Sequence, residues 1–270
     1  MDIILNKYNK WVLYGVAVSI ILGCQKTKNF HDVKFYAHSV TGLYNPGGYF
    51  NPNTVEGLEY ALSFEGLEGL EMDVQFSSDS SLWMFHDLTL EDNTTGQGKV
   101  CERDDAYLAS LVFLKNETPL SRLKDLKIQT IQGEKDIYLD LKYLGSCLVN
   151  TPSAQRVLDE CIVFLNHPQL NVSFICNDIG LATDLHNLGY SVWADGANFE
   201  SLDLSSVIYD GWFVRNADIG SEEIASVNAS DKRIILYDTF SSLSVNAAIE
   251  KAPYALLVED LIDAVVLARE

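Results

Sequence analysis

The sequence is poor in basic residues. Its 270 residues contain 19 Lys and Arg against 38 Asp and Glu, which gives a formal net charge of −19 and a pI near 4.5. A surface with this charge repels nucleic acids and the anionic faces of membranes. We therefore expect no nucleic-acid partner. No internal repeat is visible either.

Cysteine is scarce and never occurs as a C-x-x-C pair, so the sequence does not predict a zinc site. Apart from Cys24, the cysteines are Cys101, Cys147, Cys161 and Cys176. Outside the cytoplasm they could form disulfides. At this density we expect buried apolar side chains instead, and the spacing leaves any pairing open.

A hydrophobic run long enough to span a membrane comfortably is also missing. The apolar run from Trp11 to Leu22 is short, and it predicts a secretory signal peptide over residues 1–23. The end of this run, Ile21-Leu22-Gly23-Cys24, resembles a bacterial lipoprotein cleavage box. That resemblance implies lipidation of Cys24, a tether over residues 24–33, and a protein held in the bacterial cell envelope by its lipid anchor alone. An ordinary signal peptide or a short membrane anchor are the alternatives.

The rest of the chain is rich enough in apolar residues, at 47% of the sequence, to form a large core. Strand-like and helix-like segments alternate from residue 34 onwards, which favours a parallel sheet. We expect one domain over residues 34–270, an α/β (β/α)8 TIM barrel, which typically needs about 250 residues. We count nine candidate strands, so one either pairs outside the barrel or is not a strand: 34–38, 69–75, 81–87, 136–142, 172–176, 191–194, 211–214, 233–237 and 254–258.

Two acids stand on one face of a candidate strand. Glu71 and Asp73 are two residues apart, and side chains alternate between the faces of a strand. Neighbouring carboxylates repel each other unless a positive charge lies between them, and oxygen ligands suit Mg²⁺ or Ca²⁺. The pair therefore predicts a metal site. The alternative is an E-x-D that arises by chance on a solvated face.

Further polar residues lie at or near strand ends, where the chemistry of a barrel is found. They are His38, Asp73, His86 and Asp140. Lys142 shares a face with Asp140 and could hold an anionic oxygen as a fixed charge. Each has a plainer interpretation: the histidines as hydrogen-bonded residues at the mouth, Lys142 as a structural ion pair.

Together these residues resemble the glycerophosphodiester phosphodiesterase family, within the superfamily of phosphatidylinositol-phospholipase-C-like barrels. The similarity covers about residues 34–142. It rests on His38, Glu71-Met72-Asp73-Val74, His86-Asp87, Asp140-Leu141-Lys142, the loop from Asn93 to Gly98, and Asn53-Thr54, which is similar to the end of the family's Glu-Asn-Thr motif.

The resemblance implies the role of each residue. Glu71, Asp73 and Asp140 would bind one divalent cation, Mg²⁺ or Ca²⁺. That cation and Lys142 would hold the phosphate oxygens, and His38 and His86 would serve as general base and acid on opposite sides of phosphorus. The expected activity is hydrolysis of a small phosphodiester, most simply a glycerophosphodiester, to glycerol 3-phosphate and an alcohol.

Two departures from the family pattern affect these expectations. The family's His-Arg-Gly is His38-Ser39-Val40 here, and no acid is present in Asn51-Pro52-Asn53-Thr54. A serine cannot replace a guanidinium group, which binds phosphate through two parallel hydrogen bonds. We therefore expect Arg215, or the amides of the loop from Gly42 to Gly48, to bind the phosphate.

Three functions remain open from the sequence. The first is the metal-dependent phosphodiesterase. The second is a barrel that binds a metal or a phosphorylated ligand without turnover. The third is a phospholipase-C/D-like lipid phosphodiesterase, with a pocket lined by aromatic residues at the strand ends: Trp193, Trp212 and Tyr237.

Overall fold

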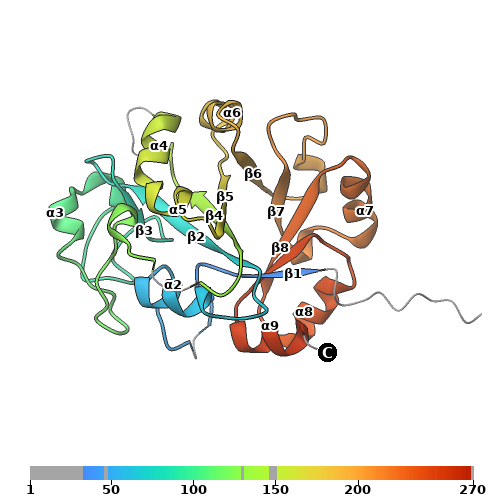
Figure 1. Cartoon of the computed structure of the whole chain (residues 1–270), viewed down its shortest axis with the longest axis horizontal. Helices are drawn as coiled ribbons and strands as arrows, with labels where there is room; N and C mark the ends of the chain where they lie inside the picture. Colours follow the sequence, from blue (N-terminus) through green and yellow to red (C-terminus); the bar gives the residue numbers. More distant parts are fainter. Residues whose placement is uncertain (1–32, 46–47, 129–130, 146–150, 269–270) are drawn as a thin grey trace, which may run out of the picture.

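The computed structural model describes residues 33–45, 48–128, 131–145 and 151–268 (Figure 1). The expected signal peptide, the lipidated Cys24 and all of the tether except residue 33 lie outside these ranges. Among the residues described, no helix is both long and apolar enough to cross a membrane.

Eight parallel strands form a closed barrel. Each strand pairs with its neighbours in parallel, and the first strand pairs with both the second and the last. In Figure 1 the blue first strand accordingly lies beside the orange and red elements at the end of the chain. This confirms the (β/α)8 TIM barrel. The strands are β1 (Lys34–Ala37), β2 (Gly69–Phe76), β4 (Lys135–Leu141), β5 (Leu170–Ile175), β6 (Ser191–Gly196), β7 (Gly211–Arg215), β8 (Arg233–Thr239) and β9 (Ala255–Val258).

The candidate strand at 81–87 does not join the barrel. It forms β3 (Leu82–Met84), which lies outside it. It pairs antiparallel with the end of β2, with Met84 opposite Val74. The chain thus passes the barrel mouth along β2 and turns back along β3. His86 therefore returns to the level of Asp73, and it does so through a hairpin rather than through a parallel strand.

Helices surround the strands, and the segment containing β3 and α3 projects on one side (Figure 1). Thr54 caps the first of the helices, its hydroxyl accepting the Gly57 N–H at 3.2 Å. The helical segment between residues 154 and 165 is divided at Cys161 into two helices. The α-helices are α2 (Val55–Leu62), α3 (Asp105–Leu108), α4 (Ala154–Glu160), α5 (Ile162–Leu165), α6 (Ile179–Asn187), α7 (Ser221–Ala229), α8 (Ser242–Ile249) and α9 (Leu261–Ala268), and the 3₁₀ turns are η2 (Val100–Glu102), η3 (Leu123–Asp125), η4 (Phe199–Ser201) and η5 (Asn216–Asp218).

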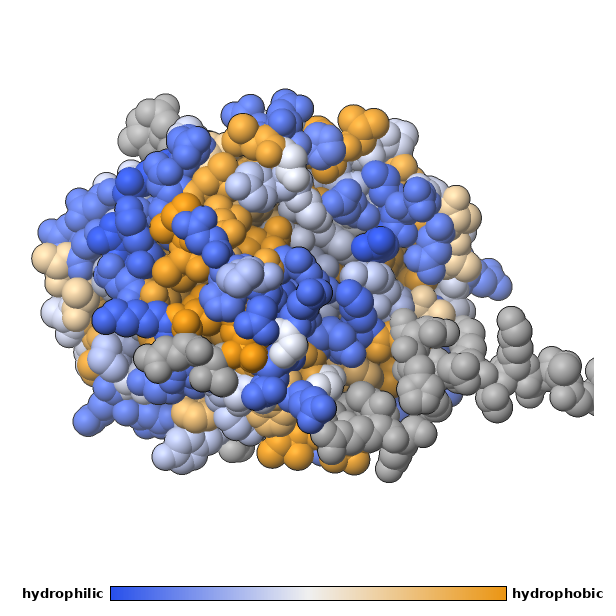
Figure 2. Space-filling view, viewed as in Figure 1, coloured by the Kyte–Doolittle hydropathy of each residue, from blue (hydrophilic) through white to orange (hydrophobic). Residues whose placement is uncertain are grey.

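The core has two layers because the strands bury both faces. The larger layer fills the space between strands and helices. On the face drawn in Figure 2, hydrophobic residues gather in a band over α2, α4 and α5, and the surface around the band is largely hydrophilic. The smaller layer fills the barrel interior with Tyr36, Tyr138, Ile175, Trp193, Phe213, Ile235, Ala255 and Leu257.

The cysteines differ from the expectation in one respect. Cys161 and Cys176 are free and buried, as expected, whereas Cys101 takes part in a disulfide. Cys24 and Cys147 lie outside the described residues.

Candidate functional site

A ring of polar side chains lies one layer above the apolar filling of the barrel. Because side chains alternate along a strand, the residue two positions after an inward-facing core residue also faces inward. At this level nearly every such residue is polar or charged. The ring consists of His38, Asp73, Asp140, Asn177, Asp195, Arg215, Tyr237 and Glu259.

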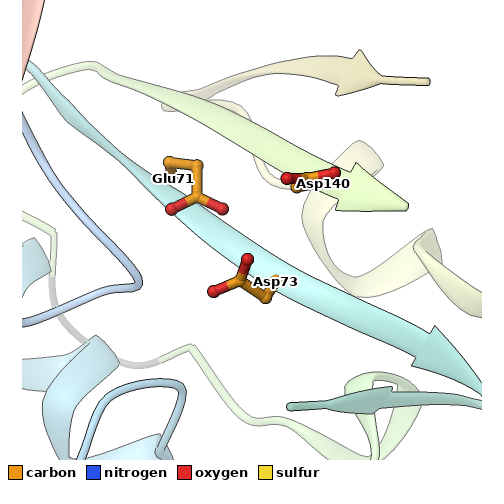
Figure 3. A group of neighbouring side chains, drawn as sticks. All are labelled: Glu71, Asp73 and Asp140. Carbon is orange, nitrogen blue, oxygen red and sulfur yellow. The ribbon is translucent and has the colours of Figure 1, made fainter. Parts of the chain in front are cut away.

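Three acids converge within this region. The register of β2 and β4 places Asp73 opposite Asp140, and Glu71 opposite Tyr138, one layer deeper. One carboxylate oxygen from each of Glu71, Asp73 and Asp140 lies within 4.8 Å of the others, and all three residues are buried. Figure 3 shows Glu71 and Asp73 side by side on β2, with Asp140 on the neighbouring strand. The structure thus brings together all three predicted metal ligands.

Burial and the neighbouring negative charges both favour the protonated forms of two of these acids. Burial, followed by the charges of Asp73 and Asp140, raises the pKa of Glu71 well above its usual value. Burial also raises the pKa of Asp140 to about 7; Asp195 and Asp73 act in the same direction and Lys142 opposes them. Glu71 Oε1 is buried without any hydrogen-bond partner, and such an oxygen normally has a partner or binds a metal.

Asp73 behaves differently because four groups stabilise its charge. Burial alone would raise its pKa, but the charges of Lys142 and His86 and two hydrogen bonds lower it. Those hydrogen bonds come from the Ser39 hydroxyl at 2.6 Å and the Asn53 amide at 2.7 Å, both to Oδ2. Asp73 Oδ1 accepts neither of these hydrogen bonds and faces Lys142 Nζ at 3.3 Å, so it is the oxygen that a metal cation could share with the lysine.

The two departures from the family pattern lie at this point of the site. Ser39 donates its N–H to Glu71 Oε2 at 2.8 Å as well as its hydroxyl to Asp73. Asn53 accepts the Asp73 N–H at 3.0 Å. Ser39, Val40 and Asn53 all have positive φ, a conformation that is uncommon for residues other than glycine. Both substituted residues therefore position the acids and add no charge.

Lys142 lies between two of the acids. Its Nζ is 2.5 Å from Asp140 Oδ2 and 3.3 Å from Asp73 Oδ1. Burial lowers the pKa of Lys142, but the charges of Asp140 and Asp73 outweigh burial, so the net pKa is raised and the ammonium group stays protonated. When ionised, the three buried carboxylates, one of them with an unpartnered oxygen, carry more negative charge than this lysine neutralises. The residues present therefore fit a divalent cation that takes oxygen ligands.

Both predicted histidines reach the mouth, and each has a carboxylate partner. His38 Nδ1 is 2.5 Å from Glu259 Oε1, and His86 Nδ1 is 2.7 Å from Asp87 Oδ1. Burial lowers the pKa of His86, but the hydrogen bond to Asp87 and the charge of Asp73 outweigh it, so the pKa is raised. Fixing Nδ1 in this way leaves Nε2 of each ring for proton transfer.

Sequence reasoning missed two acids of the ring, Asp195 and Glu259. The available signal was their position two residues after the inward-facing Trp193 and Leu257. The strands expected at 191–194 and 254–258 each end one residue before these acids, so the sequence did not mark Asp195 or Glu259 as a strand-end acid. Glu259 is the partner of His38, and Asp195 adds negative charge beside Lys142.

Arg215 lies at the rim of the mouth. It is on the inward face of β7, its guanidinium carbon is 5.8 Å from the ring centroid of Tyr237, and its side chain is 60% exposed. The loop amides are less available than expected, because those of Gly42, Tyr44 and Gly48 already donate to acceptors within the protein. Phosphate binding by Arg215 stays a prediction.

Trp212 requires a correction. It faces away from the inward-facing Phe213 and packs, 3% exposed, in the layer between strands and helices. It therefore cannot contact a substrate in the mouth. Trp193 fills the barrel interior, so Tyr237 alone of the three proposed aromatics reaches the mouth.

The family model and the curated relative that match this chain are both glycerophosphodiester phosphodiesterases. Residues 46–169 match the model of the glycerophosphoryl diester phosphodiesterase family. Over 134 residues the chain is 27% identical to mouse glycerophosphodiester phosphodiesterase 1, an alignment that covers 46% of this chain and 38% of the relative. The chain thus spans about two fifths of the length of that curated relative.

The barrel has solved counterparts. A phosphodiesterase from Oleispira antarctica, in complex with the product sn-glycerol-3-phosphate, superposes with a TM-score of 0.69 at 15% identity, covering 88% of this chain and 97% of that one. A putative glycerophosphodiester phosphodiesterase from Galdieria sulphuraria gives a TM-score of 0.70 at 12% identity, covering 88% and 98%. At these identities the likeness concerns the fold. The resemblance of this chain to the glycerophosphoryl diester phosphodiesterase family is thus confirmed, by a family match over residues 46–169 that contains the three converging acids, His86 and Lys142.

Proposed function

We propose that this protein is a metal-dependent phosphodiesterase that hydrolyses a glycerophosphodiester to glycerol 3-phosphate and an alcohol. One observation carries the proposal: three buried carboxylates converge within 4.8 Å, beside a lysine, at the mouth that His38 and His86 also reach. The family match supports the substrate class, and so does the Oleispira antarctica phosphodiesterase, which was solved in complex with the product sn-glycerol-3-phosphate.

In this proposal Glu71, Asp73 and Asp140 hold one divalent cation, Mg²⁺ or Ca²⁺. When bound, such a cation polarises phosphoryl oxygens and stabilises the charge that develops on them. Asp73 offers Oδ1, because Ser39 and Asn53 occupy Oδ2. Glu71 offers Oε1, the buried oxygen without a partner.

The remaining groups bind the phosphate and move protons. Lys142 places a permanent positive charge next to the acids and stabilises negative charge on the phosphate oxygens. Glu259 and Asp87 fix the Nδ1 atoms of His38 and His86, so that each ring directs Nε2 at the substrate. One histidine removes a proton from the attacking water or substrate hydroxyl as its oxygen bonds to phosphorus, and the other protonates the alcohol whose P–O bond breaks. Where a substrate hydroxyl attacks, a water then opens the resulting cyclic phosphate to give glycerol 3-phosphate.

A barrel that binds without turnover is the second candidate, and the residue at position 39 favours it. Ser39 stands where the family has arginine, and its side chain is bound to Asp73 rather than directed at a phosphate. If Arg215 does not supply the missing charge, substrate would bind more weakly and the reaction would lose transition-state stabilisation.

Activity measurements separate the two candidates. The purified protein, supplied with Mg²⁺ or Ca²⁺, should release glycerol 3-phosphate from glycerophosphodiesters, and His86→Ala should lower kcat by about 100-fold or more. His186→Ala, a change of the same type on α6 outside the mouth, should leave kcat unchanged. Binding of glycerol 3-phosphate by calorimetry, without turnover of any diester, would support the second candidate instead.

We also propose that the protein is anchored through Cys24 in the bacterial cell envelope and faces away from the cytoplasm. The disulfide of Cys101 supports this location, because structural disulfides persist in oxidising compartments. Metabolic labelling with a radioactive fatty acid should mark the full-length protein, and Cys24→Ala should remove the label. A labelled Cys24→Ala variant would contradict the proposal.

A further inference from the structure

A cavity of about 740 Å³ opens beside His86, outside the ring of polar residues. It lies between the loop that follows β1 and the segment that follows β3. A binding site of this size holds a drug-sized molecule, and at about 30 Å³ each it would take roughly two dozen water molecules. The alcohol part of a small diester such as a glycerol ester fills only a fraction of it.

The walls of the cavity are largely apolar. Phe85 and Phe113 are 2% and 5% exposed, and their ring centroids are 6.1 Å apart. Leu114 and Tyr44 also line the cavity and are 56% and 57% exposed. Exposed side chains of this kind lose contact with water when an apolar group enters, which favours binding.

Hydrogen bonds hold the two walls together. Lys115 Nζ donates to the Gly48 carbonyl and Asn116 Nδ2 to the Tyr49 carbonyl, each at 2.8 Å. These bonds attach the segment that follows β3 to the loop that follows β1. Leu114 N–H donates to the Asn93 carbonyl at 2.9 Å. The cavity is therefore a defined part of the fold.

The polar residues near His86 are already engaged with one another. Asp87 accepts one hydrogen bond from the Asn93 amide through Oδ2 and holds His86 Nδ1 through Oδ1, so both of its oxygens are already engaged. Lys115 and Asp92 also line the cavity, and their opposite charges offset each other. The apolar side chains of the walls therefore favour an uncharged, apolar ligand group over a quaternary ammonium group.

We infer that the part of the diester bound on the His86 side carries an apolar chain, which occupies the cavity lined by Leu43, Tyr44, Phe85, Phe113 and Leu114. This inference rests on the proposed phosphodiesterase function and narrows its substrate class. The substrate is then an amphiphilic phosphodiester with its phosphate at the acids and its chain in the cavity.

A series of glycerophosphodiesters with ethyl, butyl, hexyl and octyl alcohols tests the inference. Each methylene that enters the cavity should raise kcat/KM by about fourfold until the cavity is full. Leu114→Asp should flatten this dependence on chain length, and the side chain is exposed enough for the variant to fold. Leu243→Asp, at an 82% exposed leucine on α8 outside the cavity, should retain it.

The outcomes distinguish this inference from the proposed function. Turnover that does not depend on chain length, or a choline ester preferred over its uncharged 3,3-dimethylbutyl analogue, would overturn the inference and leave the phosphodiesterase intact. If no diester is hydrolysed, the proposed function fails, and calorimetry with the alkyl glycerophosphates then tests the cavity as a binding site. Affinity that rises with chain length in the wild type, but not in Leu114→Asp, supports the inference. Equal affinities for all chain lengths reject it.

Discussion

Glu259 Oε1 lies 2.5 Å from Nδ1 of His38, and Glu259 Oε2 accepts the N–H of Tyr44 at 2.9 Å. One carboxylate therefore fixes a histidine at the end of β1 and the loop that follows it. Gly42 is part of the same contact, since a Cβ there would meet the Glu259 carbonyl oxygen at 2.0 Å. Glu259, directly after β9, thus fixes the orientation of the predicted catalytic residue His38.

We expect Glu259→Gln to lower kcat by about 10- to 100-fold with little change in KM, because the amide would no longer hold His38 in one orientation and tautomer. Steady-state kinetics on a glycerophosphodiester measures this. Glu65→Gln, an exposed glutamate outside the mouth, is the matched control. An unchanged kcat for Glu259→Gln would show that His38 does not need this partner.

Stability should depend on pH and on divalent cations together. The pKa of Asp140 is raised to about 7 in the fold, and that of Glu71 is also raised. Their protonated forms are therefore favoured by folding, and this stabilisation is complete below their ordinary pKa values and is lost as pH rises through about 7. A cation competes with those protons, so it should bind better at higher pH.

The measurement is Tm with and without Mg²⁺ or Ca²⁺. The cation should raise Tm more near pH 8 than near pH 5, and at 100 times its Kd it should add about 2.7 kcal/mol. Glu71→Gln should abolish the response and stabilise the metal-free protein at the higher pH, because a buried charge disappears. An equal cation effect at both pH values would count against the triad as ligands.

Arg215 offers a test of how the phosphate is bound. If its exposed guanidinium replaces the family's arginine, Arg215→Ala should lower kcat/KM by about tenfold or more, since a charge-assisted hydrogen bond is lost. Arg215→Lys should restore part of the activity. Arg103→Ala, which removes a guanidinium outside the mouth, serves as the control. Equal kcat/KM for Arg215→Ala and the wild type would show that phosphate binding does not need the Arg215 guanidinium.

A buried glutamate anchors the hairpin that carries His86. The Glu160 side chain has no exposed surface, its Oε2 accepts the Leu82 N–H at 3.2 Å, and Arg156 and Arg122 lie 3.3 and 3.5 Å from its oxygens. Glu160→Gln should lower the free energy of unfolding by about 3 kcal/mol, because the surrounding cations lose their counter-charge. Urea denaturation measures this, and Asp159→Asn on the exposed side of α4 should change stability little.

Much of the site was accessible from the sequence. The i, i+2 spacing of Glu71 and Asp73, and of Asp140 and Lys142, fixes their shared faces once the strands are recognised. The rule that barrel chemistry lies at the carboxyl ends of the strands adds His38. His86 was assigned to the right region for an incomplete reason, because its strand returns antiparallel to β2 instead of joining the barrel.

Other residues could not be assigned by pattern. The strand from Gly211 to Val214 is apolar on both faces, so no alternation indicated that Trp212 faces the helices. Ser39 and Asn53 were interpreted as lost charges, whereas both are bound to Asp73 through hydrogen bonds that depend on a left-handed backbone.

The alternation of strands and helices, the faces on which the acids lie and the family that the motifs resemble could all be predicted from the sequence, because each depends on local periodicity or on short spacings. Which residues meet across the closed barrel could not, because that depends on how distant strands pair. His38 and Glu259 are 221 positions apart in the chain, and they become neighbours because β1 pairs with β9. The cavity beside His86 likewise arises only where two distant loops are joined by hydrogen bonds, a contact that no local pattern encodes.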